Sequence, residues 1–346
     1  MPIFAYCRRL GAIVLGLCIG THAYAAYAAE KLSVYTAFEN EQLAPYKQAF
    51  EKANPGIEIE WVRDSTGIVT ARLMAEKANP QADVVWGLGA SSLLLLDQDS
   101  MLETYAPAGL NQIKPKFKSE KTPPTWVGVD AWMAAICYNT VEGEAKQLTK
   151  PVSWADLIKP EYKGMITMPN PASSGTGFLT VSGWLQQMGE EKAWEFMDKL
   201  NENIAAYAHS GSKPCKDAAA GEHPIGISIE YTGASLKTKG APIDVILPTE
   251  GSGWDMEATA ILKGTKKLDA AEKLVDWAVT REANELYNNY YTVVAMEGVK
   301  KEIPNYPANA EAHMIADNNF TWAAENRQRI LAEWTKRYDS KSEAKK

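Results

Sequence analysis

A tract of small hydroxyl residues and glycines begins a predicted helix in the middle of the chain. Residues 170–178 read Asn-Pro-Ala-Ser-Ser-Gly-Thr-Gly-Phe, and an apolar helical run follows them. The first backbone N–H groups of a helix have no partner within the helix, so they bind small anions. Ordinary N-capping needs one polar side chain, whereas this tract offers Ser173, Ser174 and Thr176 beside Gly175. We therefore predict that these four residues bind an anion.

A second turn of similar chemistry lies earlier in the chain. Residues 64–67 read Asp-Ser-Thr-Gly and also precede a helical stretch. Ser65, Thr66 and Gly67 either complete the same anion site or form an ordinary helix cap. Two such turns in one chain favour an anion held between two lobes.

Strands and helices alternate in the segment that carries the first turn. The hydrophobic patterns predict strands at 32–36, 57–62 and 83–86, with helices at 39–53, 65–78 and 91–98. This alternation is typical of an α/β fold with a parallel sheet. A long apolar strand at 127–138 is expected to cross into a second lobe. Later patterns predict strands at 163–168, 225–231, 244–247 and 257–262, and helices from 174 and at 191–203, 269–280 and 319–338.

The expected architecture is two α/β lobes joined by hinge strands, with a ligand cleft between them. The 346 residues are enough for two separate cores. We assign residues 29–132 and 243–298 to the first lobe, and residues 133–242 and 299–340 to the second. Residues 341–346 are rich in lysine and are expected to form a disordered tail.

Residues 1–28 have the order of a secretory signal peptide. Two arginines precede an apolar run at 10–20, and small residues lead to an expected cleavage site near Ala28. A lipid anchor at Cys18 is the alternative, and Leu17 before it disfavours that anchor. We therefore expect export to a bacterial periplasm.

Cysteine content and charge narrow the function further. Cleavage would leave Cys137 and Cys215, which in an oxidising compartment favour one disulfide, with two buried thiols as the alternative. The formal net charge is −7 and the sequence has no basic stripe, which argues against nucleic acid and anionic membranes as partners. The sequence contains no Cys-x-x-Cys pair and no cysteine–histidine cluster, so neither a metal ion nor another cofactor is expected.

Several segments resemble the solute-binding proteins of ABC importers, in the type II branch that includes ferric-ion, hexose-phosphate and phosphonate binders. They are Val-Arg-Asp-Ser-Thr-Gly-Ile at 62–68, Asn-Pro-Gln-Ala-Asp-Val-Val-Trp at 79–86 and the tract at 168–177. Residues 38–54 and 154–157, with His-Ser-Gly-Ser-Lys-Pro-Cys at 209–215 and Trp-Asp-Met-Glu-Ala at 254–258, are most similar to the 2-aminoethylphosphonate-binding group.

The resemblance covers essentially all of the chain after residue 28. It implies a type II periplasmic-binding-protein fold, a small phosphonate ligand and an inner-membrane ABC permease as partner, and we expect a monomer. Ferric-ion members have two adjacent tyrosines where this chain has Glu230, Tyr231 and Thr232. Losing one phenolate should weaken a site for a hard cation, so iron is disfavoured.

The implied ligand has two ends of opposite charge. A phosphonate carries roughly one and a half to two negative charges on three oxygens, and 2-aminoethylphosphonate adds an ammonium. The two hydroxyl turns would bind the phosphonate, and carboxylates or aromatic faces would bind the ammonium. The candidates for that end are Glu39, Glu230, Asp255, Glu257, Tyr231, Trp86, Trp132 and Trp254.

Three of the candidates have equally good alternatives. Glu39 is also explained as an acid in the first turn of a helix, where the helix dipole favours it. By resemblance to the hexose-phosphate binders, His209 or Ser210 contacts the ligand. Alternatively, the two residues belong to a capped turn held by the predicted disulfide.

Two rival functions follow from the same residues. The nearer rival is a receptor for a hexose phosphate or another organophosphonate. The more distant rival is an exported phosphonate or phosphate hydrolase, which would need a metal cluster or an activated nucleophile. Ser174 has no Gly-x-Ser-x-Gly setting, and the histidines show no metal-ligand spacing. We therefore predict a periplasmic receptor that closes around 2-aminoethylphosphonate, and not an enzyme.

Overall fold

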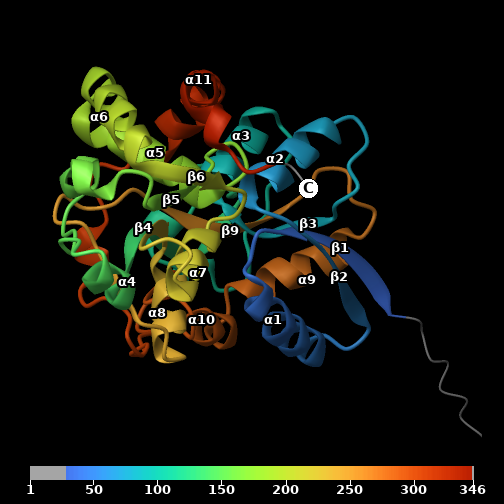
Figure 1. Cartoon of the computed structure of the whole chain (residues 1–346). Helices are drawn as coiled ribbons and strands as arrows, with labels where there is room; N and C mark the ends of the chain where they lie inside the picture. The colour runs from blue at the N-terminus through green and yellow to red at the C-terminus, as the bar shows by residue number, and fades with distance from the viewer. Residues whose placement is uncertain (1–28, 345–346) are drawn as a thin grey trace, which may run out of the picture.

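The computed structural model describes residues 29–344. The predicted signal peptide at 1–28, with its two cysteines, and the last two residues of the predicted tail lie outside the described residues. Two clusters of buried hydrophobic side chains define two lobes, which Figure 1 shows at the right and the left. Residues 32–131 and 256–299 build the first core, and residues 132–231 and 323–338, with Tyr291, build the second.

The first lobe begins with three strand–helix pairs, close to the predicted positions. They are β1 (Glu30–Thr36), α1 (Asn40–Ala53), β2 (Ile57–Arg63), α2 (Thr66–Ala75), β3 (Val84–Gly89) and α3 (Ala90–Gln98). β1 lies between β2 and β3 and is parallel to both. The carboxyl ends of the three strands therefore meet at one edge of the sheet, where α/β proteins bind ligands.

One long strand runs through both lobes. β4 (Val127–Asn139) is buried along its whole length. Its first half pairs antiparallel with β9 (Trp254–Ile261), which also pairs with β3. Its second half pairs with β7 (Ile225–Ile229) and β8 (Ile243–Ile246). β4 therefore joins the sheets of the two lobes.

The second lobe contains a parallel sheet with β5 (Ile166–Pro169) between β6 (Ile204–Ala208) and β7. Its helices include α4 (Thr140–Ala145), α5 (Gly175–Met188), α6 (Glu190–Asn203), α7 (Lys213–Ala220) and α8 (Glu230–Thr238). α9 (Leu268–Ala278), α10 (Arg281–Tyr287) and β10 (Val293–Val294) complete the first lobe. α11 (Phe320–Tyr338) buries Ile330 and Trp334 in the second core (Figure 1).

Three boundary predictions are wrong. The strand predicted at 225–231 ends at Ile229, because its pairing with β4 ends there, and α8 begins at the next residue. β8 pairs with the second half of β4, so it extends the second-lobe sheet instead of returning the chain to the first lobe. Lys341, assigned to the tail, donates from Nζ to the Ile204 carbonyl oxygen at 2.7 Å, so the described end of the tail is held against β6.

Cys137 and Cys215 form the predicted disulfide. The bond joins β4 to α7 across 78 residues of sequence, and both side chains are fully buried. It therefore fixes the start of α7, and with it the turn at 209–212 that precedes this helix.

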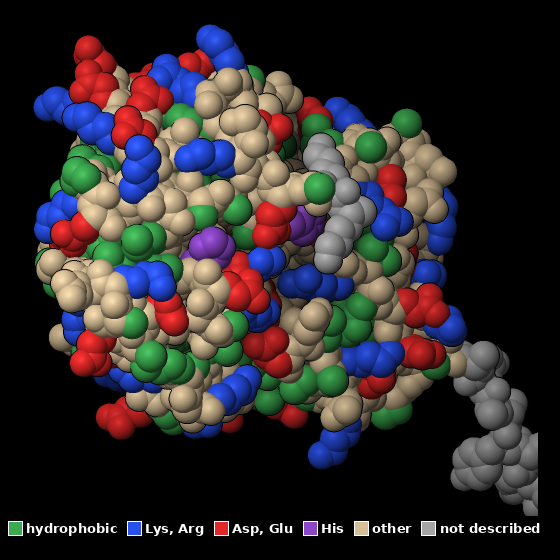
Figure 2. All heavy atoms as spheres, in the orientation of Figure 1, with side chains coloured by type: hydrophobic (Ala, Val, Ile, Leu, Met, Phe, Trp, Pro, Cys, Tyr) green, Lys and Arg blue, Asp and Glu red, His purple; other side chains and the backbone are tan. Residues whose placement is uncertain are grey.

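The surface carries charges of both signs. Figure 2 shows Lys and Arg side chains intermixed with Asp and Glu side chains over the visible face. Within residues 29–344, every helix is too short or too polar to cross a bilayer.

Candidate functional site

A small polar cavity lies where the two lobes meet. Its volume is about 30 Å³, which is room for roughly two water molecules. The lobes are closed beside it, because the Gly67 N–H of the first lobe hydrogen-bonds the Ser173 carbonyl oxygen of the second at 2.8 Å. Its lining comes from both lobes: Ala37, Glu39, Arg63, Ser65, Thr66, Gly87, Trp132, Ser174, Gly175, Thr176, Gly211, Ile229, Glu257 and Tyr291.

The first-lobe side of the cavity begins at the turn between β2 and α2. Ser65 is the N-cap residue of α2, and its backbone is extended, with a φ of −64° and a ψ of 148°. Among the described residues, the Ser65 side chain makes no capping hydrogen bond. Ser65 and Thr66 both line the cavity, and each is largely buried. Capping therefore does not account for the Ser65 hydroxyl, which is available to a ligand.

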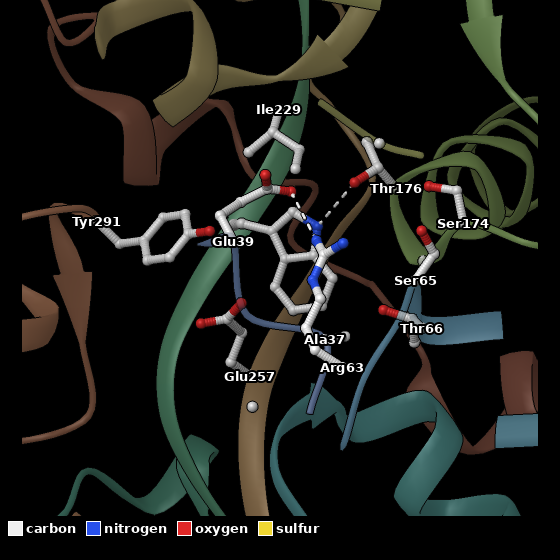
Figure 3. Close-up of a pocket in the computed structure, with 14 residues that line it drawn as sticks. Ala37, Glu39, Arg63, Ser65, Thr66, Ser174, Thr176, Ile229, Glu257 and Tyr291 are labelled. Atoms are coloured by element: carbon white, nitrogen blue, oxygen red, sulfur yellow. Dashed lines mark hydrogen bonds and ion pairs between the residues drawn. The ribbon is translucent and has the colours of Figure 1, made fainter. Parts of the chain in front are cut away.

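The second-lobe side begins at the N-terminus of α5. The Oγ of Ser174 accepts a hydrogen bond from the Gly177 N–H at 3.3 Å, so Ser174 is the N-cap of this helix. The Oγ1 of Thr176 accepts from the Trp132 Nε1–H at 3.3 Å. A hydroxyl that accepts one hydrogen bond still has its own proton to donate. Figure 3 shows both hydroxyls on the same side of the cavity as Ser65 and Thr66.

The two turns touch each other directly. The Gly67 N–H donates to the Ser173 carbonyl oxygen at 2.8 Å, which is a hydrogen bond between the lobes. A Cβ atom at Gly175 would lie 2.6 Å from the Thr66 Oγ1. The atoms that a Cβ atom at Gly175 would meet belong to the Thr66 side chain, whereas a Cβ atom at Gly67 would meet backbone of the other lobe. The closed state therefore requires glycine at 67.

Arg63 places a cation in the cavity. It is the last residue of β2, its Nε donates to the Phe38 carbonyl oxygen at 2.9 Å, and its Nη2 lies 3.7 Å from the Glu39 Oε1. Figure 3 shows it between Glu39 and the hydroxyl turns. The sequence prediction missed Arg63, because it sought an anion site made only of hydroxyl and N–H groups. Arg63 could have been predicted from its position at the end of a strand, two residues before Ser65.

The opposite side of the cavity is acidic and aromatic. Glu39 and Glu257 line it together with Tyr291 and Trp132. Figure 3 shows the Glu257 carboxylate on the side of Tyr291, whereas the Glu39 carboxylate points toward Arg63. Glu39 lies at the start of α1, where its N–H donates to the Gln42 Oε1 at 2.6 Å. Glu39 therefore lies at the start of a helix and also lines the cavity, so the two interpretations of this residue are compatible.

The sequence model of the bacterial extracellular solute-binding protein family matches residues 79–326, which is well over half of the chain. The chain belongs to this family. A Sinorhizobium fredii relative named "Probable ABC transporter periplasmic-binding protein" is 27% identical over 295 residues, which cover 82% of this chain and 79% of that protein. A Salmonella typhi relative named "Putative 2-aminoethylphosphonate-binding periplasmic protein" is 23% identical over 249 residues and 68% of each chain.

The solved structures agree with this membership. The periplasmic binding protein AfuA from Actinobacillus pleuropneumoniae, with exogenous fructose-6-phosphate bound, matches with a TM-score of 0.84 at 28% identity. The match covers 90% of this chain and 99% of AfuA. The predicted resemblance and the type II periplasmic-binding-protein fold are confirmed. The protein is the substrate-binding component of an ABC transporter, which implies a small-molecule ligand and a membrane permease as partners.

Two predicted ligand carboxylates of the binding protein lie outside the cavity. Glu230 is fully buried at the start of α8, where its Oε1 accepts from the Tyr306 hydroxyl at 2.7 Å and its Oε2 accepts from the Met133 N–H at 3.1 Å. Asp255 accepts from the Ser91 hydroxyl at 2.6 Å. Both carboxyl groups are engaged by the protein itself, so the structure does not support a role for either at the ligand.

Other predicted residues lie along the seam between the lobes. The Tyr231 hydroxyl is 3.5 Å from the Glu41 Oε1, and the His209 Nε2 is 3.3 Å from the Asp64 Oδ1. The Ser173 hydroxyl donates to the His209 carbonyl oxygen at 2.7 Å. Each of these contacts bridges or supports the closed lobes, and none of these side chains lines the cavity.

The remaining candidates have packing positions. Ser210 is partly buried, and the neighbouring Gly211 lines the cavity in its place. Trp86 packs against Tyr46 in the first core, with ring centroids 5.7 Å apart. Trp254 packs edge-on against Phe320. Of the tryptophans proposed for a cation, Trp132 lines the cavity.

Burial of Glu230 makes the stability of the empty protein depend on pH. Burial raises the pKa of Glu230 to about 7, above its ordinary value of 4.5, although its hydrogen bonds oppose the rise. The folded state therefore binds the proton more tightly, and stability is lost as the pH rises from about 4.5 to about 7. The Asp255 pKa, raised by burial to about 6, adds in the same direction.

We expect Glu230→Gln to remove part of this decline, on the order of 2–3 kcal/mol between acid and neutral pH. Urea unfolding at a series of pH values measures the effect. Glu222→Gln, an exposed change of the same chemistry, is the control and should leave the pH dependence unchanged. An unaltered slope in Glu230→Gln would contradict the assignment of the proton to this residue.

Proposed function

We propose that this binding protein captures 2-aminoethylphosphonate for import. The observation that carries the proposal is the opposite chemistry of the two sides of one cavity. Arg63, Ser65, Thr66, Ser174 and Thr176 offer a positive charge and hydroxyl donors on one side. Glu257 offers a carboxylate on the other side, beside Tyr291, and Glu39 lies between the two sides, 3.7 Å from the Arg63 Nη2. A small anion with an ammonium tail satisfies both sides at once.

Several interactions favour the phosphonate end. A hydrogen bond to a charged group contributes about 1.5–3 kcal/mol. The N-termini of α2 and α5 lie at this side, and their dipoles favour a negative charge. Arg63 adds a guanidinium, whose planar fork matches the oxygens of a phosphonate.

A sugar phosphate is the second candidate, because AfuA was solved with fructose-6-phosphate. A sugar phosphate would use the same donor side. One feature favours 2-aminoethylphosphonate. The far side presents the Glu257 carboxylate, which an ammonium neutralises and a sugar hydroxyl does not.

Hydrolysis finds less support in the lining. The Ser174 Oγ accepts from the Gly177 N–H, and the residues that line the cavity include no histidine to act as its base. His209 lies instead at the seam, half exposed. A serine nucleophile needs a base within hydrogen-bond reach.

Calorimetry against a panel of ligands tests the proposal. We expect 2-aminoethylphosphonate to bind at least about tenfold more tightly than ethylphosphonate, which lacks the ammonium. Inorganic phosphate, a hexose phosphate and ferric citrate should bind more weakly still. Tighter binding of the hexose phosphate would favour the second candidate, and release of phosphate from the phosphonate would establish a hydrolase.

Ser174→Ala should weaken 2-aminoethylphosphonate binding at least about tenfold, because one donor to a charged group is lost. The same change removes the N-cap of α5, so stability should fall by about 1 kcal/mol. Thr280→Ala is the matched control. Thr280 caps α10 by accepting from the Ala283 N–H at 3.2 Å, and it does not line the cavity. Equal losses of affinity in the two variants would show that Ser174 acts only as a cap.

A further inference from the structure

Two buried carboxyl groups face each other beside the cavity. Asp130 on β4 and Glu257 on β9 are directly opposite partners in the antiparallel pairing of these strands. Their exposed fractions are 0% and 6%. Both oxygens of Asp130 and the Oε2 of Glu257 have no hydrogen-bond partner among the described residues. Opposite residues on neighbouring strands have Cβ atoms about 4.5–5.5 Å apart, so the two carboxyl groups are within reach of each other.

Among residues 29–344, the surroundings of this pair supply further acids, and no cationic side chain forms an ion pair with Asp130 or Glu257. Glu39 and Glu230 lie near it, and the neighbouring hydroxyl groups belong to Tyr46, Tyr287 and Tyr291. The described cations that approach this region, Arg63 and Lys216, lie 3.7 and 3.6 Å from the oxygens of Glu39. Two ionised carboxylates would therefore repel each other in a buried site where neither has an ion pair.

We propose that the empty binding protein holds one proton between Asp130 and Glu257, and that the cationic group of the ligand displaces this proton on binding. Glu257 is the member of the pair that lines the cavity, and Asp130 lies behind it. The inference rests on the proposed function, because it assigns the ammonium of the ligand to Glu257.

The exchange balances in charge and in atoms. In the empty protein, one carboxylic acid donates to one carboxylate, and the pair carries one negative charge. When an ammonium binds at Glu257, the shared proton leaves for solvent and both carboxyl groups become ionised. The positive charge of the ammonium then replaces the charge of the proton, so the buried region keeps a net charge of one negative unit. Burial raises the pKa of both carboxyl groups in the empty protein, and the Asp130 charge raises the pKa of Glu257 further.

Calorimetry in two buffers of different ionisation enthalpy measures the protons released. At pH 8 we expect about one proton released per 2-aminoethylphosphonate bound, and none for ethylphosphonate. Asp130→Asn and Glu257→Gln should each abolish the release, and Glu257→Gln should also weaken binding at least about tenfold. Glu222→Gln, an exposed matched change, should behave as the unaltered protein. Tight binding of 2-aminoethylphosphonate without proton release would overturn the inference and leave the proposed function standing.

A measurement without ligand separates the two proposals. Infrared spectroscopy of the empty protein at pH 8 should show the carbonyl band of a protonated carboxylic acid. The band should change in frequency in Asp130→Asn and in Glu257→Gln, because either substitution removes one member of the hydrogen-bonded pair, and it should stay unchanged in Glu230→Gln. Absence of the band in the unaltered protein would overturn the shared proton whatever the ligand is. A present band in a protein that does not bind 2-aminoethylphosphonate would support the proton pair and reject the proposed function.

Discussion

Arg63→Ala is expected to weaken 2-aminoethylphosphonate binding by about a hundredfold or more. Arg63 is the one cationic side chain among the described residues that line the cavity. Its loss removes at least one charge-assisted hydrogen bond, of about 1.5–3 kcal/mol. It also leaves Glu39 and Glu257 as the charged lining, and their repulsion of the phosphonate adds to that loss. A total near 2.7 kcal/mol corresponds to about a hundredfold in affinity.

Calorimetry with two companion variants decides how Arg63 acts. Arg63→Lys keeps the charge and loses the planar fork, so we expect a loss between those of the unaltered protein and Arg63→Ala. Arg281→Ala is the control, because Arg281 is exposed on α10 and its ion pair with Glu285 is 4.0 Å long. Binding by Arg63→Ala within about threefold of the unaltered protein would show that the hydroxyl turns alone hold the anion.

Local patterns in the sequence predicted much of the fold. The early alternation of strands and helices follows from hydrophobic periods that differ between the two elements. In α1, Gln42, Tyr46 and Phe50 are buried at a spacing of four residues. The end of β7 and the placement of β8 depend instead on their pairing with β4, which is more than eighty residues away along the chain. No local pattern near 230 or 243 carries that information.

The donor side of the cavity was also predictable, because helix starts rich in hydroxyl groups are local features. Ser65, Thr66, Ser174, Gly175 and Thr176 were predicted and do line the cavity. Their contact with a ligand remains a prediction.

The acidic side was harder to predict. Asp255 and Glu257 lie two residues apart on β9, so the sequence alone does not distinguish their positions. Ser91, on α3, hydrogen-bonds the first of them, and the second is left to face the cavity. Which of the two carboxylates faces the cavity therefore depends on Ser91, which lies far from both in the sequence. The same holds for Glu230, which sequence alone could not separate from a ligand carboxylate because its partner Tyr306 lies 76 residues away.

Closure of the lobes depends on one glycine, and this gives the second large effect. A Cβ atom at Gly67 would lie 2.2 Å from the Ala172 carbonyl oxygen and 2.8 Å from the Ser173 carbonyl oxygen. Both atoms belong to backbone, so no rotamer change relieves the clash. Gly67→Ala should therefore hold the lobes apart by roughly 1 Å, since ordinary contacts of this kind are about 3.4 Å or longer.

A gap of that size would lengthen the hydrogen bonds from the two turns to the ligand at the same time. We expect Gly67→Ala to lose about a hundredfold in affinity for 2-aminoethylphosphonate, which corresponds to about two weakened charge-assisted bonds. Folding should not suffer, because alanine is the better helix former by about 1 kcal/mol in α2. The separation of these two effects distinguishes a block to closure from simple misfolding.

Small-angle scattering with and without ligand measures closure directly, and calorimetry measures affinity. The unaltered protein should become more compact with 2-aminoethylphosphonate, whereas Gly67→Ala should keep a larger radius of gyration and an undiminished melting temperature. Ala71→Ser, on the exposed face of the same helix, is the control and should close normally. If Gly67→Ala closed and bound as the unaltered protein does, the contact between Gly67 and Ser173 would not limit closure, and the ligand would be held without it.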